Sequence, residues 1–299
     1  MKVPYPKRFT TLKDLIPLLK SRGLNIVNEQ DALDCLANIG YYRLSAYCYP
    51  LLKTPKTSHC YKSGASFDSV MNMYRFDREL RLLLFDEIEK IEVAIRSVMS
   101  NTITGELNDI FWMTDAANFY STTIFTKTIN LIQIETDKSK EEFINHFRSK
   151  YIDPFPPAWM IVEVIPFGLL CGIYNNLKSA KLKKKVAAQF GLSSAVFSSW
   201  VISLVNLRNL CGHHSRTWNR EIPVTPAEPH SPAFPWMNSA STNMKRIYYR
   251  ICMIKYLLFT ASPQNTFTQK LKVLLEAYPT IDVMAMGFPA NWRDEPLWN

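Results

Sequence analysis

The chain has 299 residues, 47% of them hydrophobic, which is enough for one large core or two smaller ones. Lys and Arg outnumber Asp and Glu by 35 to 26, and the resulting charge of +9 favours a polyanion such as RNA or an anionic surface, although it also serves solubility alone. Six cysteines are scattered without a C-x-x-C pair, which excludes a disulfide framework and indicates reduced thiols in a cytoplasmic protein.

The order of the residues argues against three further classes of protein, those that span a membrane, are secreted or bind a metal. The longest apolar stretches, 160–174 and 251–261, are interrupted by charged residues or proline and stay below the roughly 18 residues of a membrane span. We therefore expect buried helices and no membrane partner, and the amino terminus lacks the apolar run of a signal peptide. His and Cys never combine into four ligands at a recognised spacing, so we expect no metal and no other cofactor.

Helical periodicity dominates from the amino terminus onward, and it predicts an all-α fold. The first two helices are expected at Thr11–Arg22 and Asn28–Ile39, because a glycine, which commonly ends a helix, follows each of them. Residues 1–65 are expected to form an amino-terminal helical extension.

A tyrosine-rich junction follows the second predicted helix. Tyr41, Tyr42 and Arg43 place two aromatic rings beside a cation, and such groups stack on unpaired RNA bases. Ordinary packing at a helix junction is the alternative. The three residues are candidates for RNA binding by the extension.

A long amphipathic helix is predicted from Ser66 to about Ile103, where apolar residues recur three and four apart without glycine or proline. Such a helix forms the spine of a bundle, here the domain of residues 66–299. Its charged residues form i,i+4 pairs that we expect to be largely exposed: Asp77 with Arg81, and Glu92 with Arg96.

The middle of the chain alternates weak and strong helical patterns. Thr104–Lys140 is polar and poorly periodic, and it predicts loops with one or two short helices. Three prolines in the run Asp153–Pro157 exclude a helix there, and the next helix is predicted at about Ala158–Leu177 with a kink at Pro166.

The densest basic run of the chain comes next, with Lys181, Lys183, Lys184 and Lys185 inside five residues. Lysines at this density can track a phosphate backbone, or they can form only a solvated helix face. These four are further candidates for RNA binding.

The stretch R-N-x-x-x-H, formed by Arg208, Asn209 and His213, has the chemistry of a metal-free ribonuclease. A guanidinium holds a phosphate through two parallel N–H donors, and an imidazole moves a proton near neutral pH. Asn209 would orient the histidine or hold a phosphate oxygen, and His214 is a second-choice proton carrier. A buried arginine–carboxylate pair beside a surface histidine is the alternative interpretation of the motif.

The motif lies on a predicted apolar helix that begins at Ser193 or Ser194, either of which would cap it. At 100° per residue Arg208 and His213 are about 140° apart, while Asn209 shares a strip with the histidine. Arg208 falls at the edge of the apolar face and needs a partner, either a carboxylate or a second protomer. The candidate carboxylates lie on the long helix and are Asp86, Glu89 and Glu92.

The carboxy-terminal part gives weaker signals. Pro223–Pro235 contains five prolines and predicts a loop, and Asn243–Thr260 predicts a helix. Met284–Asn299 is irregular and aromatic, and the sequence assigns it no role.

Four blocks together make the chain resemble the Abi proteins of the AbiD/AbiF type, abortive-infection factors of the HEPN superfamily. They appear in the family's order between about residues 8 and 225, and they are Ile39–Tyr47, Tyr74–Arg81 continuing to Arg96, Pro157–Trp159 with Phe167–Gly168, and Arg208–Arg220. One departure is Gly212, because a glycine inside the motif weakens the helix by about 1 kcal/mol relative to alanine.

The resemblance implies a HEPN-like helical bundle that cleaves RNA without a metal, through the Arg and His of the motif. It also implies a role in halting the growth of a phage-infected prokaryotic cell, a homodimer, kinship with the nuclease modules of RNA-guided RNA-cutting effectors, and control by a cognate RNA or protein. A helical RNA-binding or protein-binding module without catalysis is the alternative.

Overall fold

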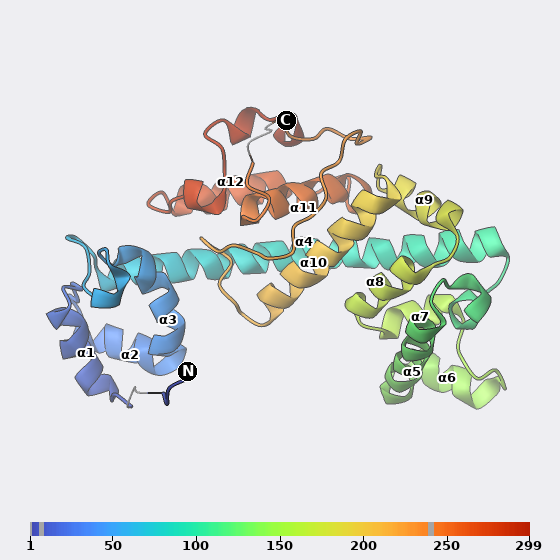
Figure 1. Ribbon diagram of the computed structural model, residues 1–299, viewed down its shortest axis with the longest axis horizontal. Coiled ribbons are helices and arrows are strands. Elements are labelled where there is room, and N and C mark those ends of the chain that lie inside the picture. The colour runs from blue at the N-terminus through green and yellow to red at the C-terminus, as the bar shows by residue number, and fades with distance from the viewer. Residues whose placement is uncertain (1, 6–8, 239–241) are drawn as a thin grey trace. The chain divides into compact units, whose positions relative to one another are not determined.

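The computed structural model describes residues 2–5, 9–238 and 242–299, and it confirms the all-α class (Figure 1). Within these ranges the chain forms twelve α-helices and no strand. Two compact units are present, Met1–Leu80 with Leu274–Ile281 and Arg81–Val273 with Asp282–Asn299. A boundary between folding domains at residue 65 stays a prediction.

Three short helices and the start of a long one build the first unit: α1 Leu12–Ser21, α2 Glu29–Ile39, α3 Tyr41–Cys48 and the beginning of α4 Phe67–Leu107. Thr11 and Asn28 cap α1 and α2 by accepting hydrogen bonds from backbone N–H groups of the first turn. Gly40 joins α2 to α3 with a φ of 86°, a conformation that disfavours any residue with a Cβ atom. The two predicted helices of this unit are therefore confirmed.

Helix α4 buries one side along its length and extends a turn beyond its predicted end. The buried side chains recur every three or four residues and are Phe76, Leu80, Leu84, Ile88, Ile91, Ile95, Met99 and Ile103. The expectation of exposed charge pairs on this helix was wrong: Asp77 and Arg81 are buried, and the Glu92 and Arg96 side chains are 14% and 11% exposed.

The buried charges of α4 have polar partners, which is why the helix tolerates them. Asp77 accepts a hydrogen bond of 2.6 Å from the Tyr47 hydroxyl, and Arg96 donates one of 2.9 Å to the carbonyl of Ile165. A helical wheel cannot show such partners, because they come from other parts of the chain.

The second unit contains the rest of α4 and most of the remaining helices. They are α5 Thr122–Lys138, α6 Glu142–Lys150, α7 Ala158–Val164, α8 Phe167–Asn176, α9 Ala180–Gln189, α10 Ser194–Gly212, α11 Ile247–Ala261 and α12 Phe267–Ala277, of which α12 ends beyond the unit boundary. Helix α10 packs against α8, α9 and α11. Helices α6 and α12 had no counterpart among the predicted elements.

Short 3₁₀ helices occupy several of the connections. They are η1 Tyr49–Leu51, η2 Lys56–Ser58, η3 Trp112–Thr114, η4 Ala116–Asn118, η5 Met284–Met286, η6 Trp292–Asp294 and η7 Pro296–Trp298.

The sequence predicted one helix with a kink at Pro166, and this was wrong. In the structure Pro166 separates two helices, α7 and α8. Ile165 is extended, with φ −81° and ψ 147°, and Pro166 stands immediately before α8. The proline ring disfavours a helical conformation in the residue before it, so α7 ends at Val164.

The aromatic carboxy-terminal stretch forms part of the core of the second unit. Trp292, Trp298 and Phe288 are buried, and the Trp298 indole donates a hydrogen bond of 3.2 Å to the hydroxyl of Tyr248 on α11. Packing is therefore the role that the sequence could not assign to this stretch.

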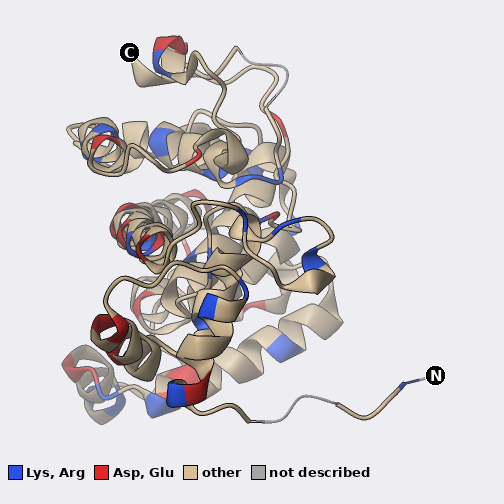
Figure 2. Cartoon of the chain, turned by 90° about the vertical axis from the view of Figure 1, so that its left-hand side faces the viewer, with Lys and Arg blue, Asp and Glu red and all other residues tan. Residues whose placement is uncertain are grey.

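The distribution of charge and the hydropathy of the helices are two further features of the described chain. Lysine and arginine are interspersed with acidic residues along the helices in Figure 2. No single described helix is long and apolar enough to cross a membrane; α9 and α10 satisfy the length and composition test only as a pair, which is bent by 66°.

Candidate functional site

Helix α10 carries the R-N-x-x-x-H motif in its last two turns. It begins where expected, because the Ser193 hydroxyl accepts a hydrogen bond from the N–H of Val196. The predicted apolar face is confirmed, and its buried members are Phe197, Trp200, Val201, Leu204, Leu207 and Cys211. This face anchors the helix in the second unit, and Asn209 and His213 lie on its exposed side.

The helix ends within the motif, at Gly212, and His213 is its C-cap residue. His214 adopts the left-handed conformation with a φ of 56°. The N–H of His214 bonds the carbonyl of Cys211 at 3.0 Å, and that of Ser215 bonds the carbonyl of Leu210 at 2.9 Å. This pair of hydrogen bonds is the Schellman motif, which normally has glycine where this chain has His214.

A non-glycine residue in the left-handed region costs about 1–3 kcal/mol and occurs preferentially at functional sites. The sequence drew attention to Gly212, as a glycine inside the motif that weakens the helix. The structure instead gives His214 the unusual conformation, and no sequence signal pointed to it.

Arg208 reaches across to α4, where Glu92 is the nearest of the expected carboxylates. The Arg208 Nε atom lies 3.9 Å from Glu92 Oε2, and the guanidinium stands over the Phe85 ring at 5.7 Å. Glu92 is also paired with Arg96, its neighbour one turn along α4. One carboxylate thus lies beside two guanidinium groups, and these three side chains together carry one net positive charge.

The motif residues are all accessible, but they do not converge. Arg208, Asn209, His213 and His214 are exposed, and the Arg208 side chain retains 45% of its surface. Arg208 turns toward Phe85 and Glu92, whereas His213 stands at the helix end about 140° further round the axis. Because Arg208 is half-exposed, its charge carries a smaller desolvation cost than a buried arginine would.

The lysine run lies on α9, and two of its members are already paired within the second unit. Lys181 lies 3.5 Å from Glu106 at the end of α4, and Lys185 pairs with the same carboxylate. Lys183 donates a 2.6 Å hydrogen bond to the carbonyl of Asn175, and burial lowers its pKa. Lys184 is exposed. Lys181, Lys184 and Lys185 keep exposed side chains that a phosphate could reach, although two of them share Glu106, whereas Lys183 is tied to Asn175.

We expect reversal of Lys181, Lys184 and Lys185 to glutamate to weaken RNA binding and to flatten its salt dependence. Each lost contact with a phosphate of single-stranded RNA should lower the slope of log affinity against log salt by about 0.7. Fluorescence anisotropy with labelled RNA at several salt concentrations measures this slope. Reversal of Lys127, Lys138 and Lys140 changes the net charge equally and is the control; equal effects of the two triple variants would reduce α9 to a solvated face.

The tyrosine-rich junction forms helix α3 of the first unit. Tyr42 and Arg43 are exposed and Tyr41 is half-buried, and both tyrosines line a cavity of the first unit. Their role in RNA binding stays a prediction.

Residues 34–219 match the family described as Abi-like protein, which is more than half of the chain and includes all of α10. The chain belongs to this family. No curated protein and no solved structure gives a match. Membership of the Abi-like family supports a role for this protein in abortive infection, which is a form of defence. The described residues contain no group of three or more His, Cys, Asp or Glu side chains that could hold a metal ion.

Proposed function

We propose that this Abi-like protein is a cytoplasmic endoribonuclease of the HEPN type, which cleaves RNA during abortive infection. The observation that carries the proposal is the accessible pair of Arg208 and His213 at the end of α10, where a positive charge is left over from the shared Glu92. A cation and a proton carrier at one exposed helix end are the groups that phosphodiester cleavage needs without a metal.

In the proposed reaction the ribose 2′-oxygen attacks its own phosphorus atom and displaces the 5′-oxygen of the next nucleotide. His213 accepts the proton of the 2′-hydroxyl, and a second donor, for which His214 is the candidate, protonates the leaving 5′-oxygen. Arg208 neutralises the charge that develops on the phosphoryl oxygens, and Asn209 holds a phosphate oxygen or orients the histidine. The products are a 2′,3′-cyclic phosphate and a 5′-hydroxyl.

A homodimer would complete the site, because one α10 helix points its arginine and its histidine in different directions. Two copies facing each other across a two-fold axis would bring Arg208 of one protomer toward His213 of the other. Exposed apolar side chains on α4 and on the motif helix α10 support this arrangement, since exposed apolar surface often marks association sites, and one of them, Phe85, contacts Arg208. They are Leu82, Phe85 and Val93 on α4 and Ile202 on α10.

The end groups of the cleaved RNA test the reaction directly. We expect the purified protein to cleave RNA in excess EDTA and to leave 2′,3′-cyclic phosphate and 5′-hydroxyl ends, since the mechanism uses side chains alone. Ligation-based end mapping identifies these groups. Cleavage that stops in EDTA and returns with added divalent ions would contradict the proposal.

A cognate RNA or protein that restrains the nuclease is part of the same proposal. A binding module without catalysis is the second candidate, favoured by the pairing of Arg208 with Glu92, which could be purely structural. Such a module would bind RNA and leave it intact under every condition of the EDTA experiment.

A further inference from the structure

The first unit contains a cavity of about 780 Å³ between α1, α3 and the loop around η2. Its walls combine leucine side chains with aromatic rings from separate segments of the chain. The aromatic residues are Tyr5, Phe9, Tyr41, Tyr42, Tyr49 and Tyr61. A volume of this size lies within the range of small-molecule sites, which is roughly 300–1,000 Å³.

The charged groups that line the cavity are all cationic or able to become so. Arg22, Lys56 and His59 contribute to the lining, and no Asp or Glu is among the described residues that do. Lys56 donates to the carbonyl of Tyr49 at 3.1 Å, which ties it to its own loop. Arg22 has no carboxylate of the described residues within ion-pair distance, so its charge is available to a ligand.

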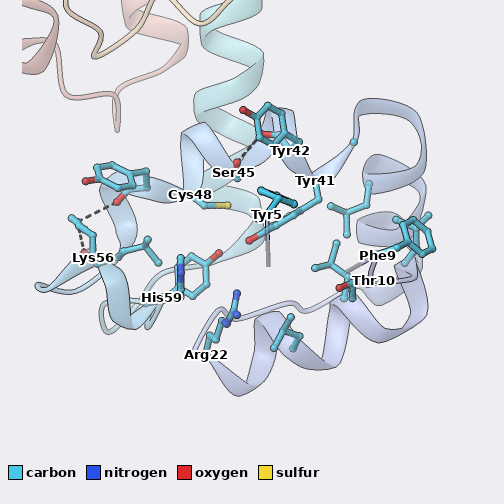
Figure 3. A pocket seen from close by; sticks show the side chains of 18 residues that line it. Tyr5, Phe9, Thr10, Arg22, Tyr41, Tyr42, Ser45, Cys48, Lys56 and His59 are labelled. Carbon is cyan, nitrogen blue, oxygen red and sulfur yellow. Dashed lines mark hydrogen bonds between the residues drawn. The ribbon is translucent and has the colours of Figure 1, made fainter. Parts of the chain in front are cut away.

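Figure 3 shows Arg22 pointing into the cavity from the end of α1, and Tyr41 and Cys48 of α3 also point into the cavity. Lys56 instead turns toward the carbonyl of Tyr49. The Cys48 and Tyr61 side chains are buried, and Tyr41 is half-buried. Burial raises the pKa of all three groups, which keeps the phenols and the thiol protonated at neutral pH. Arg22 interacts with the hydroxyl of Tyr41. The cavity therefore places protonated polar groups beside a guanidinium that has a phenol, and no carboxylate of the described residues, as its neighbour.

We propose that this cavity binds a nucleotide, with Arg22 at the phosphate and the tyrosine rings against the base. A guanidinium without a carboxylate partner suits a phosphate, since it offers two parallel donors. Tyrosine rings stack on bases of any identity, and each stacked base contributes about 1–3 kcal/mol. The absence of acidic residues from the described lining favours an anion over a neutral or cationic ligand.

The nucleotide has two possible sources with the same chemistry, a free nucleoside monophosphate and the 5′-phosphorylated end of an RNA strand. The site is independent of the proposed ribonuclease chemistry, because all its described residues belong to the first unit, whereas the motif belongs to the second. A binding measurement therefore tests it whether or not the protein cleaves RNA.

Isothermal titration calorimetry on the full chain provides the test, with AMP, UMP, adenosine and inorganic phosphate as ligands. We expect at least one of the two monophosphates to bind at least tenfold more tightly than adenosine or phosphate, because both halves of the cavity then contribute. Oligonucleotides with 2′-O-methyl groups resist transesterification, and their 5′-phosphorylated and 5′-hydroxyl forms distinguish an RNA end from a free nucleotide. Failure of both monophosphates and of the 5′-phosphorylated strands to bind would overturn the proposal.

Variants then locate the ligand. Arg22→Gln should weaken binding at least tenfold, whereas Lys13→Gln on α1, which Arg22 caps, should leave binding unchanged because Lys13 does not line the cavity. His59 has a left-handed φ of 53°, and His59→Asn removes the imidazole while retaining a residue that tolerates this conformation. We expect it to weaken binding at least twofold. Unchanged affinity in a folded Arg22→Gln protein would overturn the assignment of the nucleotide to this cavity. If Arg22→Gln does not fold, unchanged affinity in both His59→Asn and Tyr41→Phe would overturn it.

Discussion

We expect His213→Ala to cleave RNA about 100 to 10,000 times more slowly than the wild type, since a positioned proton carrier contributes a factor of this size. His213 is exposed at the end of α10 and packs into no buried core, so the substitution should leave the fold intact. Initial rates on a fluorogenic RNA measure the effect, and circular dichroism confirms that the helices are retained.

His146→Ala is the matched control for this prediction. His146 is another exposed histidine of the second unit, on α6, and it lies outside the motif. Its removal should leave the cleavage rate unchanged. A His213→Ala protein that is as active as the control variant would assign the proton transfer to another group and leave His214 as the remaining histidine of the motif.

Mixing two inactive variants should restore about a quarter of the wild-type activity. Arg208→Ala retains the histidine and His213→Ala retains the arginine, so a heterodimer of the two has one complete composite site out of two. Random exchange of equal amounts makes half of all dimers heterodimers, which gives the expected quarter. Against variants that are each at least about 100 times slower than the wild type, this recovery is roughly 25-fold or more.

The control for mixing is the double variant Arg208→Ala/His213→Ala, which cannot complete a site with either single variant. Light scattering reports the oligomeric state of each protein before exchange. An active wild type that is strictly monomeric would exclude the composite site. A dimer that exchanges subunits without any recovery would place Arg208 and His213 of one chain in the same site.

Local patterns in the sequence predicted several elements well because they depend on near neighbours along the chain. Glycine after Ile39, serine before α10 and the periodic leucines and isoleucines of α4 each act within a few residues of themselves. The sequence predicted that Pro166 disturbs the helical backbone, but it predicted a kink within one helix, whereas Pro166 separates two helices. The short polar helix α6 had too few apolar residues for its period to stand out.

Sequence by itself determined the helical class, the start of the motif helix and its buried face, and the need of Arg208 for a partner. Only the tertiary structure decided that Glu92 is that partner and that it is shared with Arg96. It also decided the left-handed His214 and the cavity around Arg22. The physical reason is that helix period and capping depend on near neighbours along the chain, whereas the choice of an ion-pair partner and the lining of a cavity depend on residues that are far apart in the sequence.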